Sequence, residues 1–149
     1  MSDNLTIDNF KTESKSKRSF GFWLVFSLVI IALTQFARWL VLENDFSIFK
    51  NDKFAFSLDI PVLISYLLYL GVFFFIIKFL YQNWFNSPVL SKLGFSFILC
   101  GGISNLFERL KYGYVVDYFY IGSGVLNIAD SYIIFGAVLV FISYKSRHK

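Results

Sequence analysis

The chain has 149 residues, of which 56% are apolar and only 16% are charged, and its net charge is +4. A soluble domain is about 45–50% apolar and about 25% charged, so an ordinary soluble globule, a disordered chain and a collagen-like or coiled-coil fibre are excluded. The single cysteine and the single histidine, His148, leave no thiolate metal cluster, disulfide framework or histidine-based site. We therefore expect a small membrane protein without a metal or other cofactor, which works through carboxylates, amides, hydroxyls and arginine.

Four apolar segments are long enough to cross a bilayer, whose core of about 30 Å needs roughly 20 helical residues. In chain order they cover residues 20–42, 60–80, 89–107 and 128–144. The polar residues 1–19 lack periodicity, which predicts a disordered tail. The sequence predicts an all-α membrane protein with four transmembrane helices in one domain, residues 20–144, followed by a short tail at 145–149.

The distribution of basic residues predicts the orientation of these helices. Eight lysines and arginines lie on the side of the two termini: Lys11, Lys15, Lys17, Arg18, Lys92, Lys145, Arg147 and Lys149. Four lie on the opposite side: Lys50, Lys53, Arg109 and Lys111. We therefore expect both termini in the cytoplasm. The positive net charge then indicates topology and attraction to anionic membrane lipid, not binding to nucleic acid.

Two segments on the outer side carry strand and turn signals. Residues 43–59 alternate apolar and polar side chains around Phe46, Ile48, Phe54 and Phe56, which suits short strands at the membrane interface. Residues 108–127 contain apolar positions followed by the turn signals Gly122 and Gly124. We expect these two outer segments to form the functional surface.

Two aspartates form a candidate catalytic pair. Asp117 ends the run 113–117, and Asp130 follows Asn127 at the start of the fourth apolar segment. Two carboxylates a few ångströms apart cannot both ionise, so one takes a proton from water while the other polarises a carbonyl, which suits peptide hydrolysis. The alternative for Asp130 is a structural role at a helix N-terminus, with Asn127 as the N-cap.

The end of the third apolar segment carries further polar candidates. Asn105 and Arg109 share one helical face, so Arg109 is expected to organise the carboxylates with Asn105 as a hydrogen-bonding support. The alternative is an arginine that reaches the membrane interface and pairs with Glu108, and Arg38 in the first segment has the same alternative. Gly101 and Gly102 predict a close approach between helices.

Three motifs in the second half of the chain resemble a known family. They read GISNLFER at 102–109, GYVVDYF at 113–119 and NIADS at 127–131, followed by Gly136. In this order they resemble the lipoprotein signal peptidases, the type II bacterial signal peptidases, which are intramembrane aspartyl proteases. The family patterns are approximately G-x-x-x-N-x-x-D-R, G-x-V-x-D-F/Y and F-N-x-A-D. Residues 51–57, NDKFAFS, resemble a fourth motif in the first outer loop.

The resemblance implies a function and a role for each matching residue. Asp117 and Asp130 would be the catalytic pair, and a β-cradle on the outer surface would carry Asn51, which contacts the substrate. The supporting positions would be Gln35, Arg38, Asn105, Glu108, Arg109 and Asn127. The chain would remove the signal peptide from diacylglyceryl-modified prolipoproteins, cutting before the lipidated cysteine. It would act as a monomer in the bacterial cytoplasmic (inner) membrane, with its site near the outer face.

The sequence also departs from the family pattern. Glu108 replaces an aspartate, Lys53 a glycine and Leu126 a phenylalanine, and Thr34 stands where the first helix usually carries an aspartate. These departures leave one alternative open, a non-catalytic relative that binds lipidated signal peptides. A second alternative is a small transport subunit in which Asp130 and Arg109 form an ion or proton path.

Overall fold

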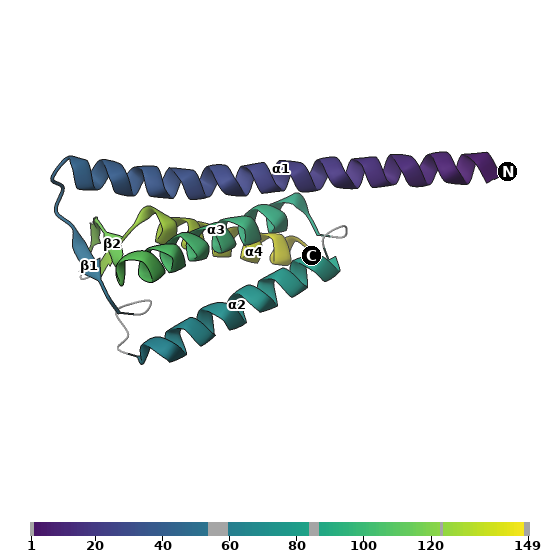
Figure 1. Ribbon diagram of the computed structural model, residues 1–149. Helices are drawn as coiled ribbons and strands as arrows, with labels where there is room; N and C mark the ends of the chain where they lie inside the picture. The colour runs from purple at the N-terminus through teal and green to yellow at the C-terminus, as the bar shows by residue number, and fades with distance from the viewer. Residues whose placement is uncertain (1, 54–59, 84–86, 123, 148–149) are drawn as a thin grey trace.

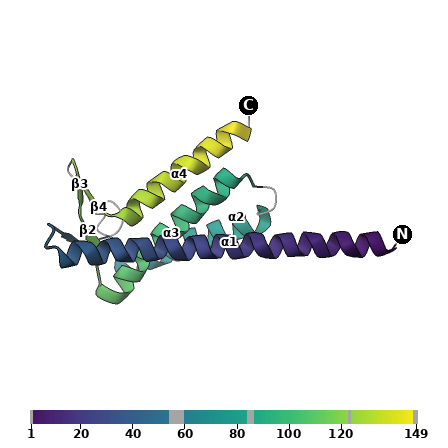
Figure 2. The same cartoon turned by 90° about the horizontal axis from the view of Figure 1, so that it is seen from above.

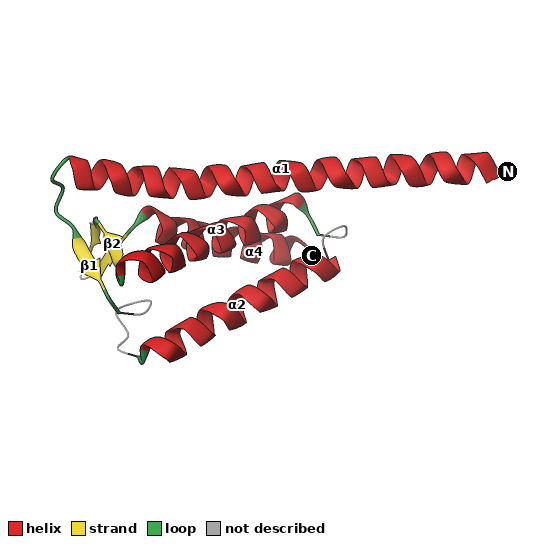
Figure 3. Ribbon diagram, in the orientation of Figure 1, coloured by secondary structure: helices red, strands yellow, loops and turns green. Residues whose placement is uncertain are grey.

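Four helices run roughly lengthwise through the molecule, and short strands gather at one end (Figures 1 and 3). The computed structural model describes residues 2–53, 60–83, 87–122 and 124–147. Its helices are α1 (Ser2–Glu43), α2 (Val62–Asn83), α3 (Val89–Tyr112) and α4 (Ile128–Arg147). Each helix contains a stretch long and apolar enough to cross a membrane, at Gly21–Glu43, Leu63–Gln82, Val89–Tyr112 and Ile128–Ser146. The four predicted spans are therefore confirmed by length and composition.

Helix α1 is longer than the sequence predicts. It begins at Ser2, so residues 2–19, expected as a disordered tail, continue the first span as helix. This stretch contains neither proline nor glycine. Nothing in it therefore interrupts a helix once the apolar span has formed the costly first turns.

Glycines bring α3 and α4 into close contact. A Cβ atom on Gly94 would lie 2.7 Å from the carbonyl oxygen of Gly136, and one on Gly101 would overlap the carbonyl oxygen of Ala129. The helix backbones therefore touch directly, as small residues allow in membrane helices. The predicted role of Gly101 is confirmed, and Gly102 faces the ring of Phe73 on α2.

Helix α3 extends past the predicted end at residue 107, to Tyr112. Glu108 and Arg109 are therefore helical, which confirms that Asn105 and Arg109 share a helical face, and both side chains have partners at this end of the bundle. The helix stops at Gly113, whose φ of 82° is left-handed and whose N–H donates to the carbonyl oxygen of Arg109 at 3.0 Å.

The strands form two small antiparallel sheets. One pairs β1 (Phe49–Asn51) with β2 (Val115–Asp117), and the other pairs β3 (Phe119–Ile121) with β4 (Gly124–Leu126). The second pair is a hairpin that extends away from the helices (Figure 2). The expected outer strands are thus present, although the first begins after Phe46 and Ile48. Phe54 and Phe56 lie outside the described residues.

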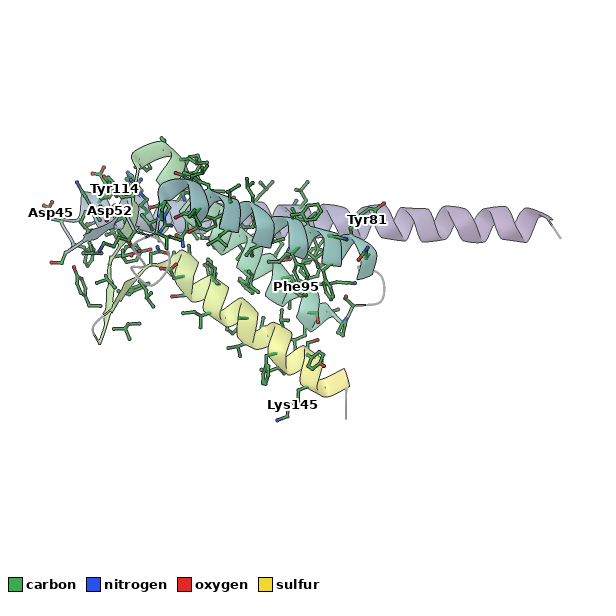
Figure 4. The ribbon with its side chains drawn as sticks, turned by 90° about the horizontal axis from the view of Figure 1, so that it is seen from below. Asp45, Asp52, Tyr81, Phe95, Tyr114 and Lys145 are labelled. Atoms are coloured by element: carbon green, nitrogen blue, oxygen red, sulfur yellow. The ribbon has the colours of Figure 1, made fainter. Side chains whose placement is uncertain are left out.

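The two ends of the molecule differ in what they carry. Both chain termini lie away from the strands (Figures 1 and 2). Asp45, Asp52 and Tyr114 lie at the strand end, whereas Lys145 lies at the other (Figure 4). Lys50 on β1 and Lys145 near the end of α4, one from each predicted basic group, therefore lie at opposite ends of the bundle.

Candidate active site

Strand β2 delivers Asp117 to the interior at the strand end of the bundle. All three residues of β2 are buried, and Asp117 is only 1% exposed. Asn51 pairs opposite Val115, so it lies diagonally across from Asp117 on the same face of the sheet. The Asn51 amide donates to Asp117 Oδ2 at 2.9 Å. The β1–β2 register therefore fixes one side of this carboxylate.

Helix α4 delivers Asp130 from its first turn. Asp130 Oδ2 accepts the backbone N–H of Asn127 at 3.2 Å, while the Asp130 N–H donates to Asn127 Oδ1 at 3.0 Å. This reciprocal pair has the form of a capping box. The structural alternative for Asp130 is therefore correct as far as it goes, but Asp130 Oδ1 also accepts the Asn105 amide at 2.7 Å.

Two asparagines join the aspartates into one network. The Asn127 amide nitrogen donates to Asp117 Oδ1 at 2.7 Å and to Asn105 Oδ1 at 3.1 Å. Asn105 in turn donates to Asp130. Both asparagines are buried, at 4% and 5% exposed. Since each amide has defined donors and an acceptor, the network fixes which oxygens of the two carboxylates are occupied.

The surroundings of Asp117 favour its protonated form. Burial raises the pKa of Asp117 above its ordinary value, and the nearby Asp130 charge raises it further. The hydrogen bonds from Asn51 and Asn127, and the positive charge of Arg109, lower it. Tyr118, the next residue, also has a raised pKa because of burial, and its hydroxyl oxygen accepts the N–H of Ile128 at 3.3 Å.

Glu108 and Arg38 support strand β2, which also carries Asp117. Glu108 Oε2 accepts the backbone N–H of Val116 at 3.0 Å, and Arg38 Nε lies 3.4 Å from the same oxygen. The Arg38 guanidinium also stacks on the Tyr112 ring, 4.0 Å from its centre. The ion pair of Glu108 is therefore made with Arg38 of α1, in place of the neighbour Arg109 that the sequence suggested.

Among the described residues, the amide nitrogen of the predicted supporting residue Gln35 makes no such contact. This Nε2 atom is buried without a hydrogen-bond partner there, so it does not join the network.

Arg109 binds differently from the sequence-based expectation. Its Nη1 donates to the Tyr69 hydroxyl of α2 at 2.9 Å, and its Nη2 donates to the carbonyl oxygen of Lys53 at 2.7 Å. Both hydrogen bonds that the structure describes for Arg109 thus go to neutral oxygens. Its charge still acts on Asp117 and Asp130 from nearby.

Sequence reasoning missed two residues that the structure places beside the site. Tyr69 stands in an apolar helix, where a phenol hydroxyl needs a partner, and this polar group was the available signal. Ser104 lies 2.7 Å from Thr34, whose own hydroxyl donates to the Ile31 carbonyl oxygen. Ser104 must therefore be the donor of the pair, which ties α3 to α1 one residue before Asn105.

The site consists of two carboxylates whose oxygens accept hydrogen bonds from neutral amides. Within the described ranges no group of three or more histidine, cysteine, aspartate or glutamate side chains is arranged to hold a metal ion. One carboxylate of a close pair can keep a proton while the other acts as a base. The arrangement can therefore supply a general acid and a general base to one substrate.

Comparisons with known proteins agree on one family. The family model described as "Signal peptidase (SPase) II" matches residues 23–145. Proteins named lipoprotein signal peptidase from Brucella ovis and Brucella melitensis are 40% identical over 70 residues, which is 42% of this chain and 44% of theirs. The match thus spans less than half the length of these curated relatives.

Two solved structures, each titled as a bacterial membrane enzyme, share the fold. One, at 2.3 Å resolution, has a TM-score of 0.69 and 15% identity, with 87% of this chain and 90% of that chain covered. The other, at 1.9 Å resolution, has a TM-score of 0.71 and 16% identity, with 83% and 92% covered. At this identity the likeness shows that the architecture is shared.

Proposed function

This chain belongs to the signal peptidase II family, and from that premise we propose that it is an intramembrane aspartic endopeptidase. Its substrates are diacylglyceryl-modified prolipoproteins, and it cuts on the N-terminal side of the lipidated cysteine. Asp117 and Asp130 are the catalytic pair. The observation that carries this assignment is the continuous network Asp117–Asn127–Asn105–Asp130.

The reaction follows from the two protonation states of the pair. The ionised aspartate accepts a proton from a water molecule, and the water oxygen attacks the scissile carbonyl carbon. The protonated aspartate donates to the carbonyl oxygen, which forms a tetrahedral diol. The protonated aspartate then donates to the amide nitrogen, and the other aspartate takes a proton from a diol hydroxyl as the carbon–nitrogen bond breaks. The products are a carboxylic acid and a free amine, and the pair again holds one shared proton. Because the two groups titrate together, the pair is treated as a unit.

The supporting residues keep the pair in place. Asn51 and Asn127 hold the two oxygens of Asp117, while Asn105 and the Asn127 backbone hold those of Asp130. Glu108 and Arg38 fix the strand that carries Asp117. Preorganised groups of this kind need not rearrange during the reaction, which lowers its barrier.

The proposed setting is the bacterial cytoplasmic membrane. With both termini in the cytoplasm, the strand end faces outward and places Asp117 and Asp130 near the outer interface. A signal peptide in the membrane then presents its cleavage site at the same level, beside the lipid attached to its cysteine. We propose that the enzyme works as a monomer.

The family match does not favour the transport alternative. Three of the four departures from the family pattern are also accommodated here, which weakens the case for a non-catalytic relative. Thr34 is hydrogen-bonded to Ser104, Glu108 reaches the Val116 N–H, and Lys53 contributes its backbone carbonyl.

The test is cleavage of a defined substrate by the purified protein in detergent or lipid. A prolipoprotein carrying diacylglyceryl on its cysteine is compared with the same polypeptide without lipid, and the products are weighed by mass spectrometry. The proposal expects cleavage of the lipidated form alone, immediately before the modified cysteine. Equal cleavage of both forms, a different site, or no cleavage by folded protein contradicts it.

A further inference from the structure

Helix α2 contacts α3 at three successive points between the turn that joins the two helices and the strand end. Near the turn between them, the rings of Phe79 and Phe95 are 5.1 Å apart. Further along, the Phe73 ring lies against Gly102. At the strand end, where the two ribbons separate (Figure 1), Tyr69 meets Arg109, and both side chains are long. This last contact is polar, unlike the other two.

Arg109 connects three parts of the chain at this point. It belongs to α3, its Nη1 reaches Tyr69 on α2, and its Nη2 reaches the Lys53 carbonyl oxygen two residues after β1. A guanidinium presents its N–H donors in a rigid planar fork, so fixing one nitrogen orients the other. The phenol oxygen of Tyr69 therefore helps to set the direction of the bond to Lys53.

The segment held by Arg109 also carries a residue of the candidate active site. The Lys53 N–H donates to Asn51 Oδ1 at 3.2 Å, and the Asn51 amide donates to Asp117. A chain of contacts thus runs from Tyr69 through Arg109 and the backbone of Lys53 to Asn51. It ends on a carboxylate of the proposed pair.

We propose that Tyr69 is a positioning residue, which through Arg109 holds residues 51–53 against the candidate active site. We call this group, Tyr69, Arg109 and the Lys53 carbonyl, the Arg109 clamp. Its effect on cleavage rests on the proposed function, whereas its effect on the segment does not. Tyr69 makes other contacts as well, and the inference needs only the hydroxyl oxygen that Arg109 uses.

Limited proteolysis measures the clamp directly. Trypsin cuts after lysine, and the Lys53–Phe54 peptide bond contains the carbonyl that Arg109 binds. Tyr69→Phe removes the hydroxyl and keeps the ring, which lies 6.2 Å from the Phe73 ring. We expect trypsin to cut after Lys53 about tenfold faster in this variant, because a hydrogen bond to a charged group is lost. Tyr66→Phe makes the same chemical change one turn earlier in α2 and serves as the matched control.

A double variant shows whether Tyr69 acts through Arg109. Arg109→Gln alone removes the bond to Lys53, so adding Tyr69→Phe is expected to increase cutting no further. An additive increase overturns the inference, as does a wild-type rate in Tyr69→Phe or an equal rate in Tyr66→Phe. Thermal unfolding of each variant shows that the fold is retained, and cutting after Lys145 provides an internal reference at the opposite end.

Cleavage of a lipidated prolipoprotein provides the second readout. We expect kcat/KM to fall about tenfold in Tyr69→Phe and to remain unchanged in Tyr66→Phe. If wild type fails to cut the substrate while the trypsin result holds, the proposed function fails and the clamp stands. If the substrate is cut normally by Tyr69→Phe and the trypsin rates are unchanged, the clamp fails and the proposed function stands.

Discussion

Helices α3 and α2 are both membrane-length, yet they are held in the protein in different ways. Within an 18-residue stretch of each span, 39% of the residues are buried inside the protein in α3, compared with 6% in α2. Helix α3 presses its glycines against the backbone of α4, whereas α2 makes separate side-chain contacts. The pair α3–α4 carries Asn105 and Asp130, so the tightly packed region is also the one that positions the proposed chemistry.

How apolar a helix is and how closely it is fixed against its neighbour are therefore separate properties in this protein. Over an 18-residue stretch of each span, α2 has the highest mean hydropathy of the four, at 2.2, and α3 has the lowest, at 1.4. Since lipid is as apolar as a leucine side chain, hydrophobicity places a helix in the membrane without fixing it against a neighbour. Small residues and polar contacts fix the helix against its neighbour.

The strongest way to break the comparison is to push α3 and α4 apart. Gly101→Ile would place side-chain atoms against the Ala129 backbone and Ile133. Separating the helices by about 1 Å moves Asn105 away from Asp130, so we expect cleavage to fall by about 100-fold, with a lower Tm. Gly71→Ile is the control, because among the described residues no atom beyond its chain neighbours and the adjacent turns of its own helix backbone lies within 4 Å of its Cβ position. An equal loss in both variants would contradict the proposed role of α3–α4 packing.

A more local test removes the bridge between the carboxylates and keeps the helix start. Asn127→Ser retains a good N-cap but loses the amide that donates to Asp117 and Asn105. We expect a fall in kcat/KM of about tenfold to 100-fold, with Tm nearly unchanged. Asn44→Ser changes an exposed amide at the end of α1 and is expected to have no effect. Normal activity in Asn127→Ser would mean that the bridge is not needed.

The pH profile tests the electrostatics of Asp117. Burial raises its pKa in the folded protein, so the stability that this group contributes falls as pH rises from its ordinary pKa toward the raised one. Asn51→Ala removes a donor that favours the ionised form, so the pKa rises further. Since Asp117 is the carboxyl whose surroundings favour the protonated form, we expect the alkaline limb of the kcat/KM profile to move to higher pH in this variant. Asp52→Asn, which changes an exposed neighbour, should leave the limb in place, and a downward move in Asn51→Ala would contradict the account.

The smallest effect is expected at Lys53, which replaces a family glycine. Its side chain is exposed, and its contact with Arg109 uses the backbone carbonyl. Among the described residues the only non-glycine with a positive φ is Asp45, so the Lys53 backbone does not need glycine. We expect Lys53→Gly to change kcat/KM by no more than about twofold. A large gain would instead indicate that this lysine impairs the enzyme.

The spans could be predicted because each leaves its own signal in the chain. Runs of about 20 apolar residues, Gly101 and the capping pair Asn127–Asp130 are local patterns with direct physical meaning. The apolar run of the third span ends at residue 107, although Asn105 and Arg109 were expected to share a helical face, and α3 continues to Tyr112. Residues 2–19 were expected to be disordered from their polarity, while the structure continues α1 through them.

Partner choice could not be read from the sequence. Arg38 and Arg109 both stand within reach of Glu108 in principle, and only the packing of α1 on α3 decides for Arg38. Likewise the link from Asn51 to Asp117 depends on the β1–β2 register across 66 residues. Tyr69 was overlooked because an apolar helix gives no indication of which of its faces meets α3.

The most direct measurement compares cleavage of a lipidated prolipoprotein by wild type, Asp117→Asn and Asp130→Asn, followed by gel shift. Asp45→Asn, an exposed aspartate at the same end of the bundle, is the matched control. The account predicts that both variants lose cleavage by at least about 1,000-fold while keeping the wild-type fold and substrate binding, and that the control cuts normally. Near-normal cleavage by either Asp117→Asn or Asp130→Asn would contradict the assignment of these two carboxylates as the catalytic pair.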